Sequence, residues 1–500
     1  MKKLTLVLVL TVIALSGIAQ QVNMSFKEVK GLDNAKASGA YFLTKKDGLT
    51  IIATNKNYYV QGDIGTGVVI YGLDKEGKAA KTLVVTKQKE SMLVAANAVE
   101  DTVYMVVCGA LKNNPGCIHV FKASLSSWSL VGEPKLLYHR KNKGSNMMDW
   151  KVATSPDGHV TALSIKEYSN NSRIAKAFGK EEAEYDALIV TDNRFSPLWQ
   201  RDDLPGWYNT LTIDDEEGVH AMLVGVTDKN TYFLFANHSS MSDEMFLDSI
   251  DRADIGSCRL LNYVDGHFVA GGTIGEKRHG LHNIQYSAIF GLSYDTHNNR
   301  LVFNPQPLTP TEFAVLENRD LDSKRNEKTE MQGLTNHDGV ATPFGGVMQL
   351  WNFMTTIVYS KGSVMYIYDL FGSLMVAVDK EGNLVWRVPV RNHIASPNDQ
   401  TPIRQHIIYH NGHTYVVQTE NSKSPTEYDL SEDASRLATM TTAKATLAIY
   451  AIDDGGKVSK YTLPQEKLLF LTGKLQRIED DWYVTVSKLK KCRLINIKGL

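Results

Sequence analysis

The feature that most constrains the fold is a tight two-residue turn that recurs between short apolar runs. Eight such turns lie along the chain, 48 to 80 residues apart. They are Asp47-Gly48, Glu100-Asp101, Asp157-Gly158, Glu217-Gly218, Asp265-Gly266, Gly345-Gly346, Asn411-Gly412 and Asp480-Asp481. Asp-Gly or Asn-Gly between β-branched and aromatic runs is typical of antiparallel hairpins. The chain is therefore predicted to be all-β and to consist of repeated hairpin units.

The spacing of these turns is near or above that of a four-stranded propeller blade. In several units a second strand pair follows, for example "VVIYGLDKEGKAAKTLVV" and "LAIYAIDDGGKVSKYTLP". We therefore predict a β-propeller of four-stranded antiparallel blades, and the number of turns favours eight blades. Seven blades is the alternative, because the turn at Gly345-Gly346 has the weakest pattern.

The N-terminus predicts export. Residues 1–19 have a charged start at Lys2 and Lys3, an apolar core, and small residues at Gly17 and Ala19, as in a signal peptide. The apolar core is shorter than the ~20 residues of a spanning helix, so cleavage before Gln20 is preferred to a membrane anchor. A periplasmic, cell-surface or extracellular location follows from this prediction.

Residues 20–500 are predicted to form one propeller domain. The last unit of the chain supplies only three strands, and the run "VNMSFKEVKGL" near the N-terminus has no hairpin partner. We expect this run to complete the last blade, since closing the ring removes free sheet edges.

Charge and cysteine content limit the possible functions. The formal net charge is −1, and no basic run is present that could follow a phosphate backbone, so nucleic-acid binding is excluded. Cys108 and Cys117 flank the turn "GALKNNPG" and could form a disulfide in an exported protein. Buried, reduced thiols are the alternative.

The stretch "LMVAVDKEGNLVWRVPV" contains Ala377, Asp379, Gly382 and Trp386, and it resembles one copy of the blade motif of quinoprotein dehydrogenases. The other Asp-x-x-Gly turns of the chain lack the matching Trp. A tight turn and one large packing residue explain the motif without a quinone. We therefore predict a scaffold role for this stretch and no cofactor.

The same stretch and the following "HIIYHNGHTYVVQTEN" resemble blades of uncharacterised secreted bacterial β-propeller proteins. The resemblance mainly covers Asp369 to Asn421 and rests on Asp-x-x-Gly-x-x-x-Trp-like repeats. It implies a propeller fold and export. It implies no catalytic residue, since no chemistry is assigned to that family.

Long loops are predicted to gather on one face of the propeller. The loops between second and third strands share a face with the connections between blades, because antiparallel strands alternate in direction. The largest insertions, Thr309 to Thr335 and Glu420 to Ala443, both belong to this face. Each contains a Ser/Thr-Pro-Thr-Glu sequence that is typical of a helix start. We expect two short helices that decorate the surface outside the core.

Candidate binding residues lie in or beside the same loops. The loop "GEKRHGLHNIQY" holds Arg278, His279, His282 and Tyr286, which could bind an anionic or polyhydroxylated group. A solvated polar loop is the alternative. Two aromatic residues near other loops could stack on a sugar or anchor a peptide, or could pack in the core: Trp351 and Tyr366.

Sequence motifs for catalysis are missing. The two histidines of the loop above have no placed carboxylates, so no metal site is predicted. The chain lacks a Gly-x-Ser-x-Gly elbow, His-Glu-x-x-His, a phosphate-binding glycine loop and Cys-x-x-Cys. We therefore predict an exported, non-catalytic protein whose loop-rich face binds a glycan, a peptide or a partner protein. A hydrolase with acids near the central channel and a structural subunit of an envelope assembly stay open as alternatives.

Overall fold

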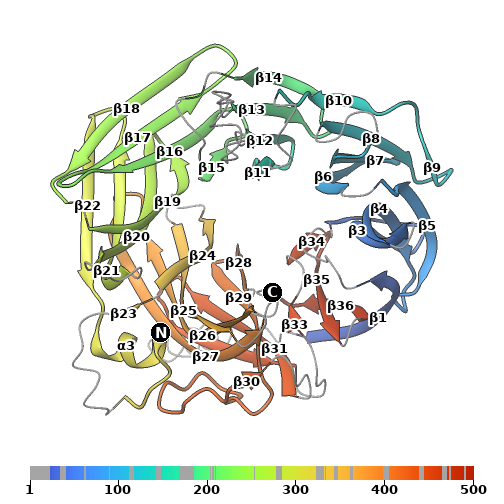
Figure 1. Ribbon diagram of the computed structural model, residues 1–500. Helices are drawn as coiled ribbons and strands as arrows, with labels where there is room; N and C mark the ends of the chain where they lie inside the picture. Colours follow the sequence, from blue (N-terminus) through green and yellow to red (C-terminus); the bar gives the residue numbers. More distant parts are fainter. Residues whose placement is uncertain are drawn as a thin grey trace, which may run out of the picture.

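The strands of the computed structural model form antiparallel sheets arranged in a ring (Figure 1). The protein is an all-β propeller of four-stranded antiparallel blades. The structure describes residues 23–33, 41–60, 63–88, 91–111, 117–141, 148–167, 185–202, 204, 208, 210–252, 254–277, 284–321, 331–332, 334–342, 347–360, 364–397, 405–438, 444–463, 470–471, 475–488 and 491–500.

The strands of these residues form eight sheets, numbered here I to VIII in chain order. Sheet I contains β2 (Tyr41–Lys46), β3 (Leu49–Val60), β4 (Asp63–Leu73) and β5 (Ala79–Thr86). Sheet II contains β6 (Met92–Val99), β7 (Thr102–Cys108), β8 (Ile118–Ser124), β9 (Ser129–Leu130) and β10 (Lys135–Tyr138). Sheet III contains β11 (Met148–Thr154), β12 (Val160–Glu167), β13 (Tyr185–Asp192) and β14 (Pro197–Arg201). Sheet IV contains β15 (Thr210–Ile213), β16 (Val219–Val226), β17 (Thr231–His238) and β18 (Asp243–Ile250).

The second half of the ring carries the additions to this plan. Sheet V contains β19 (Ile255–Val264), β20 (His267–Lys277), β21 (Ile284–Asp295), β22 (Arg300–Pro307) and β23 (Met331–Gln332). Sheet VI contains β24 (Leu334–Ala341), β25 (Val347–Ser360), β26 (Val364–Val378), β27 (Leu384–Pro397) and β30 (Leu437–Ala438). Sheet VII contains β28 (Gln405–His410), β29 (His413–Asn421), β31 (Ala445–Asp453) and β32 (Val458–Thr462). Sheet VIII contains β33 (Phe470–Leu471), β34 (Gln476–Ile478), β35 (Asp481–Lys488), β36 (Lys491–Lys498) and β1 (Asn23–Asp33).

Sheet VIII joins the two ends of the chain. β1 pairs antiparallel with β36, with Asn23 opposite Lys498 and Glu28 opposite Arg493. The strand near the N-terminus is thus the outer strand of the sheet near the C-terminus. The signal-peptide residues 1–19 lie outside the described residues.

In sheets I to V and VII the predicted tight turns join the first two strands, and in sheet VIII the turn Asp480-Asp481 joins β34 to β35. Seven of the eight predicted turns lie in the described residues, and Gly345-Gly346 lies outside them. Asp47-Gly48, Asp265-Gly266 and Asn411-Gly412 have positive φ at both positions, as a type I′ turn requires. In these three sheets, the residue types of the turn itself therefore favour the first hairpin.

The Asp-x-x-Gly segments are turns between third and fourth strands. In three of them the Asp Oδ1 accepts a backbone N–H four residues on: Asp74 from Lys78 at 2.8 Å, Asp379 from Asn383 at 2.7 Å and Asp453 from Lys457 at 2.8 Å. The Gly has a φ of 75° to 84°. Trp386, which follows one of these turns, packs so closely against the next sheet that a Cβ on Gly456 would lie 3.0 Å from it. These contacts support the predicted scaffold role of the motif.

The core is a closed series of apolar clusters between neighbouring sheets. One cluster joins sheets I and II through Ile51 and Met105, and another joins sheets VI and VII through Val388 and Val416. The series returns to its start where Ile478 of sheet VIII packs with Phe42 of sheet I. Each fully buried Leu, Ile, Val or Phe adds about 1.5–3 kcal/mol to such a core, so the sheets stabilise one another around the ring.

One of the two predicted helices is present. The helix α3 spans Pro310–Leu316, and Thr309 caps it by accepting a hydrogen bond from the Glu312 N–H at 3.2 Å. The Glu312 carboxylate in turn accepts from the Thr309 N–H at 2.7 Å. The prediction of a surface decoration is wrong for this helix, because Phe313 and Leu316 are buried between sheets V and VI.

The prediction of a second helix, at Ser424 to Met440, is wrong for its described part. Residues 422–436 form turns and bends, followed by the short strand β30. Side chains compete with helical hydrogen bonding here: Asn421 Oδ1 accepts from the Lys423 N–H at 3.0 Å, and Asp429 Oδ1 accepts from the Ser431 N–H at 2.8 Å. Such local bonds offer the backbone an alternative to the helix.

Candidate functional site

The two large insertions contact each other at the perimeter of the ring. The Asn318 side chain, just after α3, donates to the Ala434 carbonyl at 3.1 Å, and the Ala434 N–H donates back to Asn318 Oδ1 at 2.8 Å. We call residues 421–438, between β29 and β31, the β29–β31 insertion. The sequence placed both insertions on one face, and the structure packs them into one unit.

Arg391 of β27 connects the β29–β31 insertion to the segment that follows α3. Its guanidinium donates to the Leu430 carbonyl at 2.9 Å, to Asp433 Oδ1 at 3.0 Å and to the Arg319 carbonyl at 2.7 Å. The side chain is buried, and this burial lowers the pKa of Arg391, while the negative charge of Asp433 opposes the shift. Because an arginine remains charged in proteins, its three partners fix the shape of the β29–β31 insertion.

A second charged group is buried beside the insertion. Lys460 of β32 pairs with Glu420 of β29 at 2.7 Å, and both side chains are less than 5% exposed. Lys460 also donates to the Pro425 carbonyl at 2.7 Å. Tyr450 of β31 donates to the second carboxylate oxygen of Glu420, and its own pKa is raised well above 10, chiefly by burial.

The polar network continues through β29 and β28 of sheet VII to β26 of sheet VI. The Gln418 amide donates to Glu420 at 2.7 Å, and the Gln405 amide donates to Gln418 at 2.5 Å and to Ser373 at 2.8 Å. Buried polar groups are tolerated when they are hydrogen-bonded in this way. The insertion, which supplies the Pro425 carbonyl, completes the outer end of the network.

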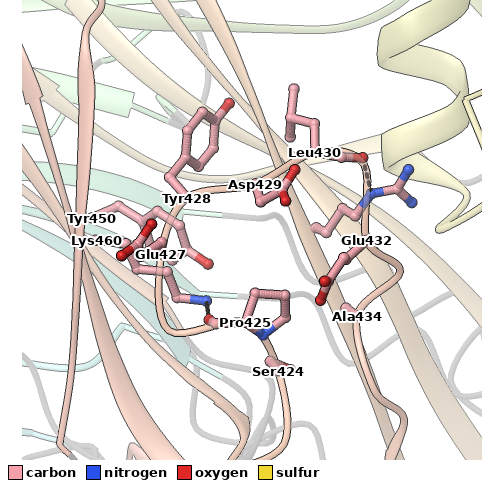
Figure 2. A pocket seen from close by; sticks show the side chains of 11 residues that line it. Ser424, Pro425, Glu427, Tyr428, Asp429, Leu430, Glu432, Ala434, Tyr450 and Lys460 are labelled. Atoms are coloured by element: carbon pink, nitrogen blue, oxygen red, sulfur yellow. Dashed lines mark hydrogen bonds between the residues drawn. The ribbon is translucent and has the colours of Figure 1, made fainter.

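A small pocket lies between the insertion and this network (Figure 2). Its volume is about 20 Å³, which suits a single water molecule. The lining residues are Arg391, Ser424, Pro425, Glu427, Tyr428, Asp429, Leu430, Glu432, Ala434, Tyr450 and Lys460. This pocket is too small for an organic ligand, so we interpret it as part of the insertion's support.

A larger cleft lies on the other side of Tyr428 and Leu430. We call it the perimeter cleft. It has a volume of about 700 Å³, within the range of ligand sites. Its lining residues are Thr309, Thr311, Glu312, Arg387, Val388, Pro389, Tyr428, Leu430, Gly456, Lys457 and Val458. The cleft therefore combines α3, β27, the β29–β31 insertion and the turn between β31 and β32.

The chemistry of the perimeter cleft is an aliphatic floor with a polar rim. Val388, Pro389 and Leu430 contribute the floor. The Tyr428 hydroxyl donates to the Pro389 carbonyl at 2.8 Å, which fixes its ring as a wall. Lys457 is exposed at the rim. Among the described residues no carboxylate forms an ion pair with Lys457, so its charge is available to a ligand.

The other two charged side chains that line the cleft, Arg387 and Glu312, form an ion pair with each other. Arg387 donates through Nε to Glu312 Oε1 at 2.6 Å and through Nη2 to Glu312 Oε2. It also donates to the Pro307 carbonyl at 3.0 Å. A bidentate pair of this kind is strong and geometrically specific. It joins the first turn of α3 to β27 where both line the cleft.

Tyr286, the predicted site residue whose side chain the structure describes, is not among the residues that line this cleft. Arg278, His279 and His282 lie outside the described residues. Trp351 and Tyr366 lie on β25 and β26, opposite Leu374 and Val358 in the strand pairing. Tyr286 is only 8% exposed and packs in the cluster with Phe313. Burial raises the pKa of Tyr286.

The two cysteines considered for a disulfide are neighbours in sheet II. Cys108 ends β7, and the Gly109 N–H donates to the Cys117 carbonyl at 3.0 Å. Both side chains are buried, and no disulfide joins them in the structure. Burial, with a smaller effect of Cys117, raises the pKa of Cys108 to about 12. The thiol is therefore protonated and a weak nucleophile at neutral pH.

The sequence analysis did not predict any single residue of the perimeter cleft. The sequence marked the β29–β31 insertion as a place for binding residues, but it gave no sign that Tyr428 and Leu430 would face β27. Val388 and Lys457 come from a strand and a turn that looked like plain scaffold. The contacts that join these four segments are all long-range.

Two further properties of the described residues bear on function. They contain no group of three or more His, Cys, Asp or Glu residues that could hold a metal ion. Among the helices in the described part of the chain, none is long and apolar enough to cross a bilayer.

Comparison with known proteins adds only a likeness of fold. No protein-family model matches the chain, and no curated protein matches it. The polysaccharide lyase Uly1 is 10% identical, with 94% of this chain and 99% of that chain covered and a TM-score of 0.39. The Dos1 propeller is 10% identical, with 94% of each chain covered and a TM-score of 0.40. An oligogalacturonate lyase from Vibrio parahaemolyticus is 10% identical, with 96% and 97% covered and a TM-score of 0.34. Likeness at this level carries no argument about activity.

Proposed function

We propose that this protein is an exported, non-catalytic binding protein that holds an extended peptide segment of a partner in the perimeter cleft. The observation that carries the proposal is the cleft itself, because four segments far apart in the sequence meet to form it. Arg391 and the Glu312–Arg387 pair hold those segments in place. A rigid scaffold that positions loop residues in this way is typical of binding sites.

The lining of the cleft favours a peptide over a glycan. Its floor is aliphatic. Among the described residues that line it, the one aromatic side chain is Tyr428, whose hydroxyl is bonded to Pro389. A Leu, Ile or Val side chain fits such a floor, and Lys457 can pair with a nearby carboxylate on the peptide. We therefore infer a segment with an aliphatic residue next to an acidic residue or a C-terminal carboxylate.

The acids beside the perimeter cleft do not favour a hydrolytic site in the cleft. Glu312, Glu420 and Asp433 each pair with a cation, namely Arg387, Lys460 and Arg391. A carboxylate whose oxygens are bonded to a cation in this way is occupied structurally and is not placed as a general acid. The described carboxylates near the cleft thus serve its architecture.

The location of the protein is part of the same proposal. Cleavage before Gln20 would deliver the propeller to the periplasm or the cell surface, where the partner would be an exported or envelope protein. N-terminal sequencing of the protein from the culture medium and from the periplasm would test this. A mature chain that still begins at Met1 would contradict export through a cleaved signal.

The binding proposal is tested with a display library of short peptides screened on the mature chain. We expect selected peptides to share an aliphatic residue and a carboxylate. Lys457→Glu and Leu430→Asp should each weaken the best peptide by at least about tenfold, equal to about 1.4 kcal/mol. Binding would be measured by fluorescence anisotropy.

Lys78→Glu is a matched control for Lys457→Glu. Lys78 is exposed and occupies the same position of an Asp-x-x-Gly turn, in sheet I, where no described cleft lies. Equal losses for both lysine variants would mean that net charge alone drives binding, and the cleft proposal would fail. A set of peptides without a shared carboxylate would also contradict it.

A further inference from the structure

β18 is the outer strand of sheet IV and has an unusual distribution of side chains. Met245 and Leu247 point to one side of the sheet and are 47% and 68% exposed. Glu244, Phe246 and Asp248 alternate with them and point to the other side, because successive strand residues face opposite ways. Within the described residues, no strand pairs with the outer edge of β18.

The sheet face that carries Met245 and Leu247 is open beyond β18. Leu247 lies opposite Leu234 of β17, and Tyr232, two residues from Leu234 on the same side, is 38% exposed. Gly225 of β16 lies opposite Tyr232, and a Cβ placed on Gly225 would meet no atom within 4 Å. An apolar face of this kind on an outer strand marks an interaction surface.

Two other outer edges of the ring, those of sheets V and VI, are protected. β27 in sheet VI is covered by β30, which pairs with it in parallel, and Leu437 of β30 is only 1% exposed. β22 in sheet V contains Pro305 and Pro307, which cannot donate a hydrogen bond to an added strand. β18 contains no proline. The chain therefore shows in β30 that an outer strand of this propeller can accept a further strand.

The charges on β18 indicate what such a strand would contain. In an added strand, residues opposite Met245 and Leu247 would share their apolar side. Residues opposite Glu244 and Asp248 would lie beside two carboxylates, and opposite charges across a strand pair are stabilising. A second copy of β18 would instead bring acids next to acids, which disfavours pairing between two copies of this chain.

We propose that β18 binds an extended basic segment of a partner protein, which adds to sheet IV as a fifth strand. The segment alternates apolar residues with Lys or Arg. This surface is separate from the perimeter cleft, which lies on sheets VI and VII, so the proposal does not depend on the function assigned to the cleft. Its mode of recognition is β-augmentation, in which backbone hydrogen bonds give affinity and alternate side chains give specificity.

The first test uses a short capped peptide in which lysine alternates with valine. We expect it to bind the mature chain, while a peptide with glutamate in place of lysine does not. The double variant Glu244→Lys, Asp248→Lys should weaken binding by about tenfold, from the loss and reversal of two cross-strand charge pairs. The matched control is Glu76→Lys, an exposed acid on sheet I, which should bind as the wild type does.

A second test separates strand addition from simple charge attraction. N-methylation of alternate residues along one edge of the peptide removes backbone donors and keeps the charge. We expect this peptide to lose binding, and equal binding by the methylated peptide would overturn the proposal. Leu247→Lys should also abolish binding, with circular dichroism confirming the fold, since Leu247 is already exposed.

The oligomeric state provides the remaining outcome. Sedimentation of the mature chain should give a monomer, in agreement with the like charges on β18. A dimer that Leu247→Lys dissociates would mean that this edge pairs with a second copy, and the basic-partner proposal would be wrong.

Discussion

The boundary between sheets VI and VII differs in kind from the boundary between sheets I and II. Between I and II the packed side chains are apolar, with Ile51, Val68 and Met105 at the centre. Between VI and VII, apolar residues share the boundary with a network that includes Glu420 and Lys460. The polar boundary is also the one that carries the β29–β31 insertion.

This difference shows what the insertion does for the scaffold. Without it, Lys460 would lose the Pro425 carbonyl, and the buried ion pair would have one hydrogen bond fewer. A buried charge is costly unless its remaining donors are satisfied. The cluster between sheets I and II consists of apolar side chains, which need no such hydrogen-bonding cover. A binding loop and a buried polar network thus occur together because each completes the other.

The largest effect should come from breaking the polar boundary on one side only. Lys460→Met leaves Glu420 buried without its cation, and we expect the free energy of unfolding to fall by about 4 kcal/mol. The double variant Glu420→Leu, Lys460→Met should recover most of this loss, because two apolar side chains replace the pair. Urea denaturation of both variants measures the difference. A double variant as unstable as the single one would show that the pair itself provides the stability.

The apolar boundary should respond without any such rescue. Met105 is fully buried between sheets I and II, and Met105→Ala should cost about 3 kcal/mol through lost contacts and a cavity. Met105→Leu conserves the volume and should cost less than about 1.5 kcal/mol. The same urea experiment checks both. If Met105→Ala were harmless, the boundary would have to be loosely packed.

The boundary between sheets VIII and I, which closes the ring, combines apolar packing with an ion pair at its edge. Its contribution to stability should depend on pH. Asp481 of sheet VIII pairs with Lys45 of sheet I at 2.9 Å. Burial alone would raise the pKa of Asp481, but hydrogen bonds from Lys45 and Asn496 outweigh burial and hold the pKa below its ordinary value. The folded chain therefore binds this proton less readily than the unfolded chain.

The sign of the effect follows from that lowered pKa. The contribution of Asp481 is complete above its unfolded pKa of about 4 and is lost as the pH falls through the folded value. We expect Asp481→Asn to cost about 1–2 kcal/mol at neutral pH. Wild type and variant should converge in acid, as followed by thermal unfolding across pH. A constant difference at every pH would remove Asp481 from the explanation.

Local chemistry explains which parts of the fold were predictable. The turns at Asp47-Gly48 and Asn411-Gly412 depend on backbone conformations that few residues adopt, so the sequence reveals them directly. The capping box of α3 is equally local and was predicted correctly. The second helix was predicted from the same Pro-Thr-Glu start and is absent from its described part, residues 424–438, because Asn421 and Asp429 bond to the backbone in their own loop.

Long-range contacts explain what the sequence could not show. Tyr428 becomes the wall of the perimeter cleft only because its hydroxyl reaches Pro389, on another sheet. The ion pair of Glu420 and Lys460 joins two strands separated by the whole of β31 and the insertion. Residue type and spacing along the chain do not predict which residues of distant strands will be in contact. For the same reason Tyr286, which looked like a loop residue, is buried beside α3.

The smallest loss of stability should come from removing the N-cap of α3. This variant tests how far the perimeter cleft depends on local hydrogen bonds. Thr309→Ala removes the side-chain acceptor of the Glu312 N–H and should cost about 1 kcal/mol or less. Thr309→Ser keeps the acceptor and should be nearly neutral. The exposed neighbour Thr311 lines the same cleft, so Thr311→Ala controls for the loss of a hydroxyl there.

Thermal unfolding gives the stabilities of these variants, and peptide binding gives their effect on the cleft. Because Phe313 and Leu316 anchor the helix from below, we expect Thr309→Ala to weaken peptide binding only slightly. A large loss of binding would mean that the cap, and not the buried side of α3, holds the cleft in shape.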